Sequence, residues 1–171
     1  MDIKSYNNLL SCFHLPRIDE IPDLELYMDQ VIIYVKKYFS IFPYSDQENF
    51  ITPSMINNYV KSGIIPPPIG KKYTKRHIAY IISIFFLKQV LSLEESRALT
   101  MIEIKSTDEK LAYEYFCEAI ETELKACVGE TKSLVQNQKS EISSHILKKT
   151  ATSIANKLYT QALIKYCITK K

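Results

Sequence analysis

Proline and glycine are distributed unevenly along the chain, and this limits the folds available to it. All seven prolines precede Lys71, and Gly129 is the only glycine between Lys71 and Lys171. Proline breaks helices and glycine weakens them, so a long stretch with one such residue favours helix. At 46% hydrophobic and 24% charged residues, the composition also excludes a disordered or fibrous chain. The second half is therefore predicted to be helical.

Local signals divide the chain into segments. Pro16 and Pro22 mark an extended lead-in, and apolar residues at three-four spacing predict a helix from Asp23 that ends before Pro43. After a polar link over 44–50, further helices are predicted over 53–61, 74–91, 93–106, 108–127 and from 142 onward. Residues 64–73 read as an extended loop or small hairpin, with its turn at Gly70. The expected fold class is all-α, mainly helical.

Several kinds of site and location lack their sequence signatures. The four cysteines, Cys12, Cys117, Cys127 and Cys167, form no CxxC pair, and no histidine stands near them in a ligand pattern. We therefore expect no metal and no cofactor. No phosphate loop or catalytic triad is visible, so an enzyme is not expected. The most apolar stretch, 78–91, is shorter than the ~20 residues of a membrane span. Free thiols and no signal peptide predict a cytoplasmic protein.

Charge is concentrated in blocks of opposite sign. Residues 51–90 contain basic residues and no acidic residue, whereas 1–50 and 91–130 are net acidic. The basic residues of this block are Lys61, Lys71, Lys72, Lys75, Arg76 and Lys88. Such a block is compatible with a nucleic-acid partner or with a solvated face that happens to lack acids. Charge alone does not decide between these two interpretations.

Residues 51–96 read as a short capped helix, a glycine stop, a lysine-rich loop and a long apolar helix. Residues 57–66 contain Asn-Asn-Tyr, three further residues and Gly-Ile-Ile-Pro; residues 71–74 are Lys-Lys-Tyr-Thr; residues 90–95 are Val-Leu-Ser-Leu-Glu-Glu. These motifs resemble Arg-Tyr-Tyr with Gly-Leu-Leu and a proline, Arg-x-Tyr-Ser, and Gly-Phe-Ser-Leu-Glu-Glu in the MerR family of bacterial transcription regulators. Asn57 replaces an arginine of that family, and Val90 replaces its corner glycine.

The resemblance implies a winged helix-turn-helix domain with a small β wing, followed here by C-terminal helices. From residue 15 to residue 90 the chain is also similar to a bacterial family of unknown function that has a MerR-like N-terminal region. We expect residues 1–104 to form the DNA-binding domain with its lead-in. Residues 105–171 are expected to form a helical region for dimerisation or effector binding.

The resemblance and the charge pattern together predict a surface for double-stranded DNA. Helix 53–61 would lie in the major groove, and the basic wing 66–76 would lie on phosphates. The candidate contacts are Thr52, Ser54, Asn57, Asn58, Tyr59, Lys61, Lys71, Lys72, Lys75 and Arg76. A helix N-terminus does not itself favour cations, so Lys75 and Arg76 at the next helix start need another partner. Phosphate is the partner expected.

Structural roles compete with these functional roles. Thr52 also suits an N-cap, and Asn57 and Asn58 could simply cap the helix or face water. The ring of Tyr59 could pack under the wing while its hydroxyl stays outside. His77 is expected at the surface. The acidic residues over 114–123 are expected to be solvated or to pair with the basic last helix.

Three hypotheses of different classes follow. The first is a sequence-specific transcription regulator, expected as a homodimer because one short helix reads few base pairs; its small-molecule effector, if any, is unknown. The second is a protein-interaction or architectural module that kept the scaffold without specific DNA reading. The third is a small-molecule-binding or enzymatic helical domain in the C-terminal half. A buried pocket with converging polar groups would favour the third.

Overall fold

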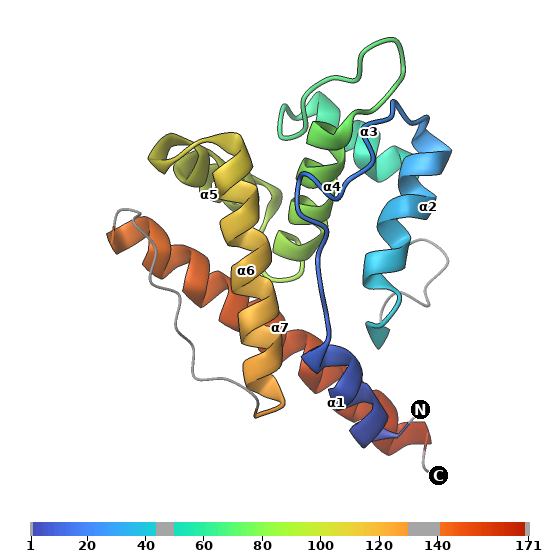
Figure 1. Cartoon of the computed structure of the whole chain (residues 1–171), viewed down its shortest axis with the longest axis vertical. Coiled ribbons are helices and arrows are strands. Elements are labelled where there is room, and N and C mark those ends of the chain that lie inside the picture. Colours follow the sequence, from blue (N-terminus) through green and yellow to red (C-terminus); the bar gives the residue numbers. More distant parts are fainter. Residues whose placement is uncertain (1, 44–49, 130–140, 170–171) are drawn as a thin grey trace.

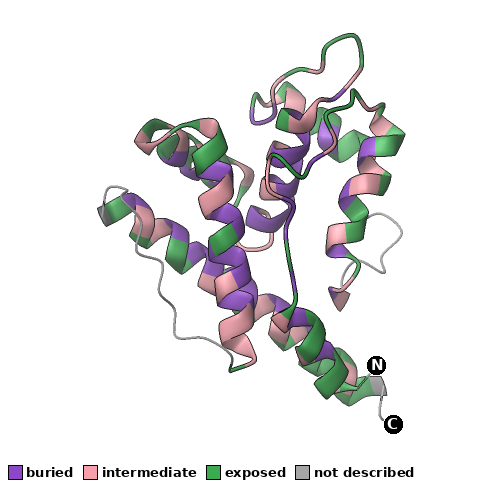
Figure 2. Ribbon diagram, in the orientation of Figure 1, coloured by how far each residue is buried: buried purple, intermediate pink, exposed green. Residues whose placement is uncertain are grey.

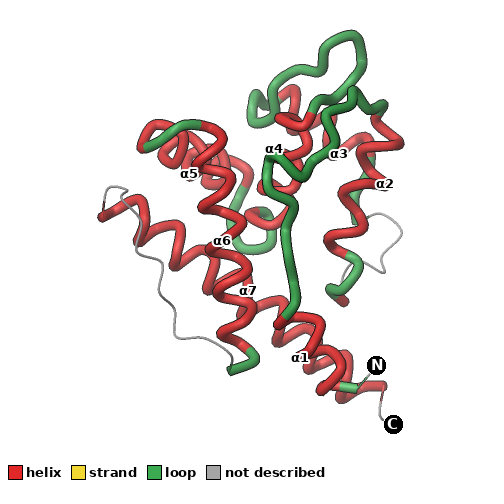
Figure 3. Tube along the Cα trace, viewed as in Figure 1, coloured by secondary structure: helices red, strands yellow, loops and turns green. Residues whose placement is uncertain are grey.

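The computed structural model describes residues 2–43, 50–129 and 141–169, and in these ranges the regular elements are helices (Figure 3). In chain order they are α1 (Ile3–Ser11), α2 (Met28–Phe39), α3 (Pro53–Lys61), α4 (Lys75–Leu87), α5 (Leu93–Ser106), α6 (Glu109–Cys127) and α7 (Glu141–Thr169). The mainly helical fold is confirmed. No β-strand occurs in the described ranges, so the small β wing is not shown. The predicted link over 44–50 lies almost entirely outside these ranges.

Short-range signals place the helix ends where the sequence predicts them. Thr52 precedes Pro53, and its hydroxyl accepts a hydrogen bond from the Met55 amide at 3.2 Å. Ser92 and Glu95 form a reciprocal capping box, with bonds of 3.2 and 2.7 Å between side chains and backbone amides. Each such pair satisfies amides that have no partner within the helix. The predicted starts of α3 and α5 are therefore confirmed.

Three boundaries differ from the sequence predictions. The unpredicted α1 is capped by Asp2, whose carboxylate accepts from the Ser5 amide at 2.8 Å. The start of the next helix at Asp23 was wrong, because α2 begins at Met28. Leu26 instead exchanges two backbone hydrogen bonds with Tyr73, of 2.9 and 2.8 Å, which holds the chain extended there. Likewise α4 ends at Leu87, and residues 88–91 form a turn.

One hydrophobic core joins the two halves of the chain, with α4 at its centre (Figure 2). The Phe86 ring of α4 lies 4.6 Å from the Phe39 ring of α2, between ring centroids, and 6.2 Å from the Phe116 ring of α6. Aromatic rings at such separations attract one another beyond the gain from burial. The expected domain boundary at 104–105 lies inside α5, and the core continues across it.

The long α7 crosses α6, and α1 lies beside its C-terminal part, so the two ends of the chain are neighbours (Figure 1). The Tyr159 hydroxyl of α7 donates to the Asn7 amide oxygen of α1 at 3.2 Å. The extended segment after α1 then runs along α6 toward α2 (Figure 1). None of the described helices has the length and apolar character needed to cross a membrane.

The lead-in is fixed to α6 by a buried ion pair. The Arg17 guanidinium donates two hydrogen bonds of 2.8 Å to the Glu121 carboxylate, and the Leu15 amide donates a third at 2.8 Å. Glu114 accepts a bond of 3.0 Å from the Ile18 amide. The expectation that these acidic residues are solvated or pair with the last helix was therefore wrong for Glu114 and Glu121.

Candidate nucleic-acid interface

Four of the candidate DNA contacts lie on one exposed face of α3. Ser54, Asn57, Asn58 and Lys61 are all exposed, and their spacing of three, four and seven residues places them on the same side of the helix. No carboxylate belongs to this helix. The structure therefore gathers two amides, a hydroxyl and a cation on a surface that is open to a partner.

The opposite face of α3 anchors the helix in the core. Ile56 is fully buried, and Tyr59 is 7% exposed with its ring centroid 5.7 Å from that of Phe85 in α4. Burial raises the pKa of the Tyr59 hydroxyl. Tyr59 thus packs against α4, and it lies away from the face formed by Ser54, Asn57, Asn58 and Lys61. Its role in the free protein is to fix the angle at which α3 is presented.

The loop after α3 ends in a tight two-residue turn where the sequence predicted a wing. Ile69 and Lys72 exchange two backbone hydrogen bonds of 3.1 and 2.9 Å around Gly70 and Lys71. Both central residues have positive φ, 56° at Gly70 and 66° at Lys71, which is the pattern of a type I′ turn. Lys71 is exposed at the tip, in a conformation that side chains with a Cβ rarely adopt. The predicted turn at Gly70 is confirmed.

Carboxylates from other parts of the chain face three of the basic residues. Lys72 lies 3.2 Å from Glu25, measured from Nζ to a carboxylate oxygen, and Lys75 lies 3.5 Å from Asp23. Arg76 donates two hydrogen bonds to Glu109 of α6, one of them 2.6 Å long. These bonds raise the pKa of Arg76 and lower that of Glu109. Half of the six basic residues in the block without acids are thus paired with acids that the fold brings to them.

Lys61 and Lys71 differ from these three cations. Both are exposed, and neither has a carboxylate partner within the described ranges. Lys61 lies at the end of α3, and Lys71 lies at the tip of the turn. They are the cations of this surface that are open to an external anion.

His77 is a structural residue that the sequence interpretation misplaced at the surface. Only 3% of it is exposed, and its Nδ1 accepts from the Thr74 amide at 3.0 Å. The other nitrogen, Nε2, lies 3.2 Å from the carbonyl oxygen of Pro67, to which it can donate. This ring ties the lysine-rich loop to the start of α4. Its place three residues after the cap Thr74 was the available signal, since that position faces back to the cap.

Residues that could hold a metal do not come together in the described ranges. No group of three or more His, Cys, Asp or Glu side chains there is close enough to bind one. Cys12 and Cys167 are exposed thiols, whereas Cys117 is fully buried in α6. Burial raises the pKa of the Cys117 thiol to about 12, so this thiol stays protonated at neutral pH.

Comparison with known proteins identifies a family over most of the chain. The model of a family described as "Domain of unknown function (DUF1836)" matches residues 16–116, which include α2 to α5, the basic loop and half of α6. The chain belongs to this family. No curated protein and no solved structure matches it.

Proposed function

We propose that this member of the DUF1836 family is a sequence-specific DNA-binding transcription regulator of MerR-like type. In this proposal α3 lies in the major groove, and segment 66–76, which comprises the loop and the first two residues of α4, lies on the phosphate backbone. The observation that carries the proposal is the exposed face of Ser54, Asn57, Asn58 and Lys61 on a helix anchored from behind. An exposed helix face with amides and a terminal cation has the size and chemistry for reading base edges.

Each residue has a distinct role in this proposal. Asn57 and Asn58 hydrogen-bond to base edges, where a good bidentate amide–adenine pair discriminates by about 1–3 kcal/mol. Lys61 and Lys71 bind phosphates and fix the register, with Ser54 and Thr52 near the helix N-terminus as lesser contacts. Thr52 also caps α3. The protein acts as a homodimer, because two copies of a nine-residue helix are needed to read a long site.

Lys72 and Lys75 join the phosphate contacts by exchanging partners. Their carboxylates belong to Glu25 and Asp23, whose side chains are 54% and 87% exposed. Exposed ion pairs of this kind contribute about 0–1 kcal/mol, so phosphate can replace the carboxylate at little cost. Arg76 is held by two bonds to Glu109 and by a nearby Tyr80 ring, and it therefore contributes least to binding.

A second candidate function is a protein-interaction module on the same scaffold. It is favoured by the pairing of Lys72, Lys75 and Arg76, which lowers the positive field around the loop. Two apolar side chains beside that loop are also largely exposed, Leu24 at 65% and Ile69 at 70%. Exposed large apolar side chains are a feature of many protein-binding surfaces.

The test is fluorescence anisotropy on a labelled pool of fragments from the genome that encodes the chain, across a salt series. We expect a subset of fragments to bind far more tightly than the bulk, with log affinity falling linearly with log salt. The double variant Lys61→Ala/Lys71→Ala should lower that slope by about 2, because two phosphate contacts are lost. Lys148→Ala/Lys149→Ala, with the same charge change on exposed residues of α7, is the matched control.

A second variant separates base reading from phosphate binding. Asn57→Ala/Asn58→Ala should remove at least about tenfold of the preference for the tight subset while leaving bulk affinity and salt slope unchanged. Equal, weak binding to every fragment would contradict sequence-specific regulation and support an architectural role. No binding at low salt would contradict DNA binding altogether and favour the protein-interaction module.

A further inference from the structure

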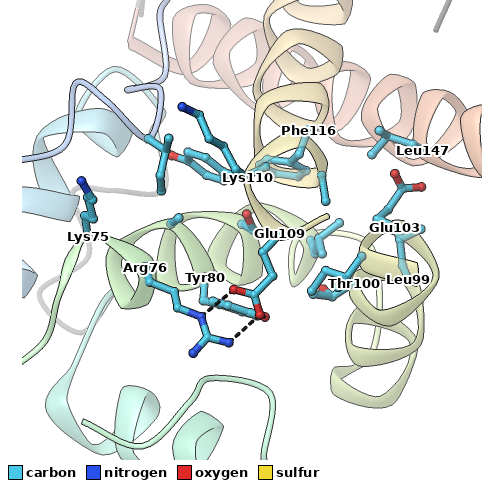
Figure 4. Close-up of a pocket in the computed structure, with 17 residues that line it drawn as sticks. Lys75, Arg76, Tyr80, Leu99, Thr100, Glu103, Glu109, Lys110, Phe116 and Leu147 are labelled. Carbon is cyan, nitrogen blue, oxygen red and sulfur yellow. Dashed lines mark hydrogen bonds and ion pairs between the residues drawn. The ribbon is translucent and has the colours of Figure 1, made fainter. Parts of the chain in front are cut away.

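A cavity of about 300 Å³ lies between α4, α5 and α6 (Figure 4). The lead-in closes part of it through Ile18, and α7 contributes Leu147. All its lining residues except Leu147 fall within the segment 16–116 that defines the family. The cavity is therefore built almost entirely by the family domain.

Most of the cavity wall is apolar. Its side chains include Ala79 and Leu87 of α4, Leu99 of α5, and Ala112 and Phe116 of α6. Small-molecule sites typically begin at about 300 Å³ and have such apolar walls with a few polar groups. The space therefore has the size and lining of a ligand site.

The polar groups of the cavity are divided between two ends. Lys75 and Lys110 lie toward one end, and Glu103 lies at the other, beyond Thr100 (Figure 4). The Arg76–Glu109 pair lies along the side between them, where its opposite charges are already matched. The basic and acidic groups of the cavity wall are thus separated, with the two lysines toward one end and a carboxylate at the other.

The two lysines are held by weak partners. Lys110 lies 2.6 Å from Asp19 and Lys75 lies 3.5 Å from Asp23, with the aspartate side chains 72% and 87% exposed. Both aspartates belong to the lead-in that borders the cavity. Exposed pairs are worth about 0–1 kcal/mol, so a ligand carboxylate placed between the lysines can replace the aspartates. At this end of the cavity, the ammonium groups of Lys75 and Lys110 can therefore form ion pairs with an anionic ligand.

The other end excludes a second anion. Glu103 is only 5% exposed, and the Ser143 hydroxyl of α7 donates to its carboxylate at 2.7 Å. A negatively charged group beside a buried carboxylate would be repelled strongly. A ligand that enters this cavity therefore places its charged group at the lysine end and its apolar part toward Leu99 and Phe116.

We propose that this cavity binds a small amphipathic carboxylate, a molecule with one anionic head and an unbranched or aromatic apolar body. The head lies between Lys75 and Lys110, and the body lies among Leu87, Leu99 and Phe116. This binding does not require the DNA-binding function. It places a ligand site in the family domain, whereas the sequence predicted effector binding in residues 105–171.

Ligand binding would also reach the basic loop. Lys75 and Arg76 form the first turn of α4, directly after that loop, and both line the cavity. A ligand carboxylate that replaces Asp23 as the ion-pair partner of Lys75 changes the local charge near Lys71 and Lys72. This consequence rests on the proposed function, and it predicts that the ligand changes DNA affinity.

The test is isothermal titration calorimetry of the whole protein with decanoate, decanol and decylamine, at concentrations where each is monomeric. We expect saturable one-to-one binding of decanoate, at least tenfold tighter than decanol, and no binding of decylamine. Lys75→Ala/Lys110→Ala should remove the preference for decanoate over decanol but keep the apolar binding. Lys148→Ala/Lys149→Ala is the control of equal charge.

A filling variant tests the location. Ser83→Leu places a larger apolar side chain in the cavity from α4, and it should weaken decanoate at least tenfold. Ser153→Leu, at an exposed position of α7, should leave binding unchanged. Because overfilling can disturb the core, helical circular dichroism and the thermal midpoint of each variant are compared with the parent protein. Ala112→Leu, from the α6 wall, gives an independent filling variant.

The outcomes separate this inference from the proposed function. No saturable decanoate binding, equal binding of decylamine, or undiminished binding by both folded filling variants would overturn the ligand site. Fluorescence anisotropy with and without decanoate then measures how far ligand binding changes the affinity for DNA. If the protein binds decanoate but no DNA, the ligand site stands and the regulator proposal fails; if it binds DNA but no decanoate, the reverse holds.

Discussion

Two carboxylates of α6 each bind an arginine from another part of the chain. The two ion pairs have the same bidentate geometry but differ in how far they are exposed to solvent. Near the middle of α6, Glu121 accepts two hydrogen bonds from Arg17 of the lead-in. At its first residue, Glu109 accepts two from Arg76 of α4. Both contacts are bidentate, the arrangement that gives arginine–carboxylate pairs their strength and direction. The surroundings decide what each pair does.

The Arg17–Glu121 pair is buried. The Glu121 side chain is 9% exposed and that of Arg17 is 27% exposed, and the Leu15 amide adds a further hydrogen bond. Burial alone lowers the pKa of Arg17, but the hydrogen bonds that it donates to Glu121 outweigh this effect, and the pKa is raised. Glu114, also on α6 and 3.5 Å from Arg17, is a second and more exposed carboxylate partner. This pair fixes the lead-in to α6.

The Arg76–Glu109 pair is open to water and borders the cavity. The side chains are 54% and 39% exposed, and the Tyr80 hydroxyl also donates to Glu109 at 3.1 Å. Solvent screens such a pair, so its contribution to stability is small. The comparison shows that the same bidentate contact stabilises the fold when it is buried and contributes little to stability when it is exposed.

The largest expected effect comes from Glu121→Ala. This change leaves the partly buried Arg17 with Glu114, 3.5 Å away, as its remaining carboxylate partner and removes the acceptor of the Leu15 amide. The loss should cost about 2 kcal/mol or more in free energy of unfolding. Urea denaturation followed by circular dichroism measures it. Glu118→Ala, one turn away at an exposed position, should cost less than about 0.5 kcal/mol. A loss below 1 kcal/mol for Glu121→Ala would contradict the comparison.

A thiol probe inside α6 sharpens the difference between the two sites. Cys117 lies one turn before Glu121 and is fully buried, with its pKa raised by burial to about 12. In the native protein it should react with a thiol reagent only through local or global opening. Glu121→Gln should speed its labelling at least tenfold, since a loss of 1.4 kcal/mol corresponds to that factor.

The same measurement contains its own controls. Cys12 and Cys167 are exposed, and they should react quickly in every variant. Glu109→Gln should leave the Cys117 labelling rate within about twofold of the parent protein, because its ion pair is screened by solvent. If Glu109→Gln speeds the labelling of Cys117 as much as Glu121→Gln does, the two ion pairs contribute equally to stability, which would contradict the comparison.

The smallest expected effect is the pH dependence of the exposed pair. Arg76 lowers the pKa of Glu109 below its ordinary value of 4.5. A carboxylate with a lowered pKa adds stability that is present above the ordinary value and is lost as the pH falls through the folded value. The stability difference between the parent protein and Glu109→Gln should thus be constant from pH 7 to 5.

Below pH 4.5 that difference should shrink toward zero, because both forms then carry a neutral group at position 109. Its full size should stay under about 1 kcal/mol, since more than a third of the Glu109 side chain is exposed. Urea titrations at neutral and acidic pH measure it. A difference that grows on acidification would contradict the assigned partner.

Much of the fold was predictable from residues that interact within one helical turn. Thr52 and Pro53 start α3, and Ser92 and Glu95 start α5, because a cap and its partner lie three residues apart whatever the rest of the chain does. The exposed face of α3 follows from the same regular spacing. The predicted start of α2 was wrong because the backbone hydrogen bonds between Leu26 and Tyr73 join two segments that no local sequence pattern connects.

The residues of the candidate DNA-binding surface were predictable from the sequence, but which of its cations are paired with carboxylates was not. Lys72, Lys75 and Arg76 stand in a block without acids, and no local signal shows that Glu25, Asp23 and Glu109 face them. Lys61 and Lys71 lack such carboxylate partners within the described ranges, and this difference depends only on how other segments pack. The cavity between α4, α5 and α6 likewise had no signature, since its wall residues are ordinary core residues of separate helices.

The sequence by itself determined the helical class, most helix ends and the polar face of α3, because these depend on contacts between near neighbours in the chain. Only the tertiary structure decided which charges are paired, that His77 is buried and that a cavity opens beside the basic loop. The reason is distance along the chain. Arg17 and Glu121 are 104 residues apart, and their meeting depends on how every helix between them packs.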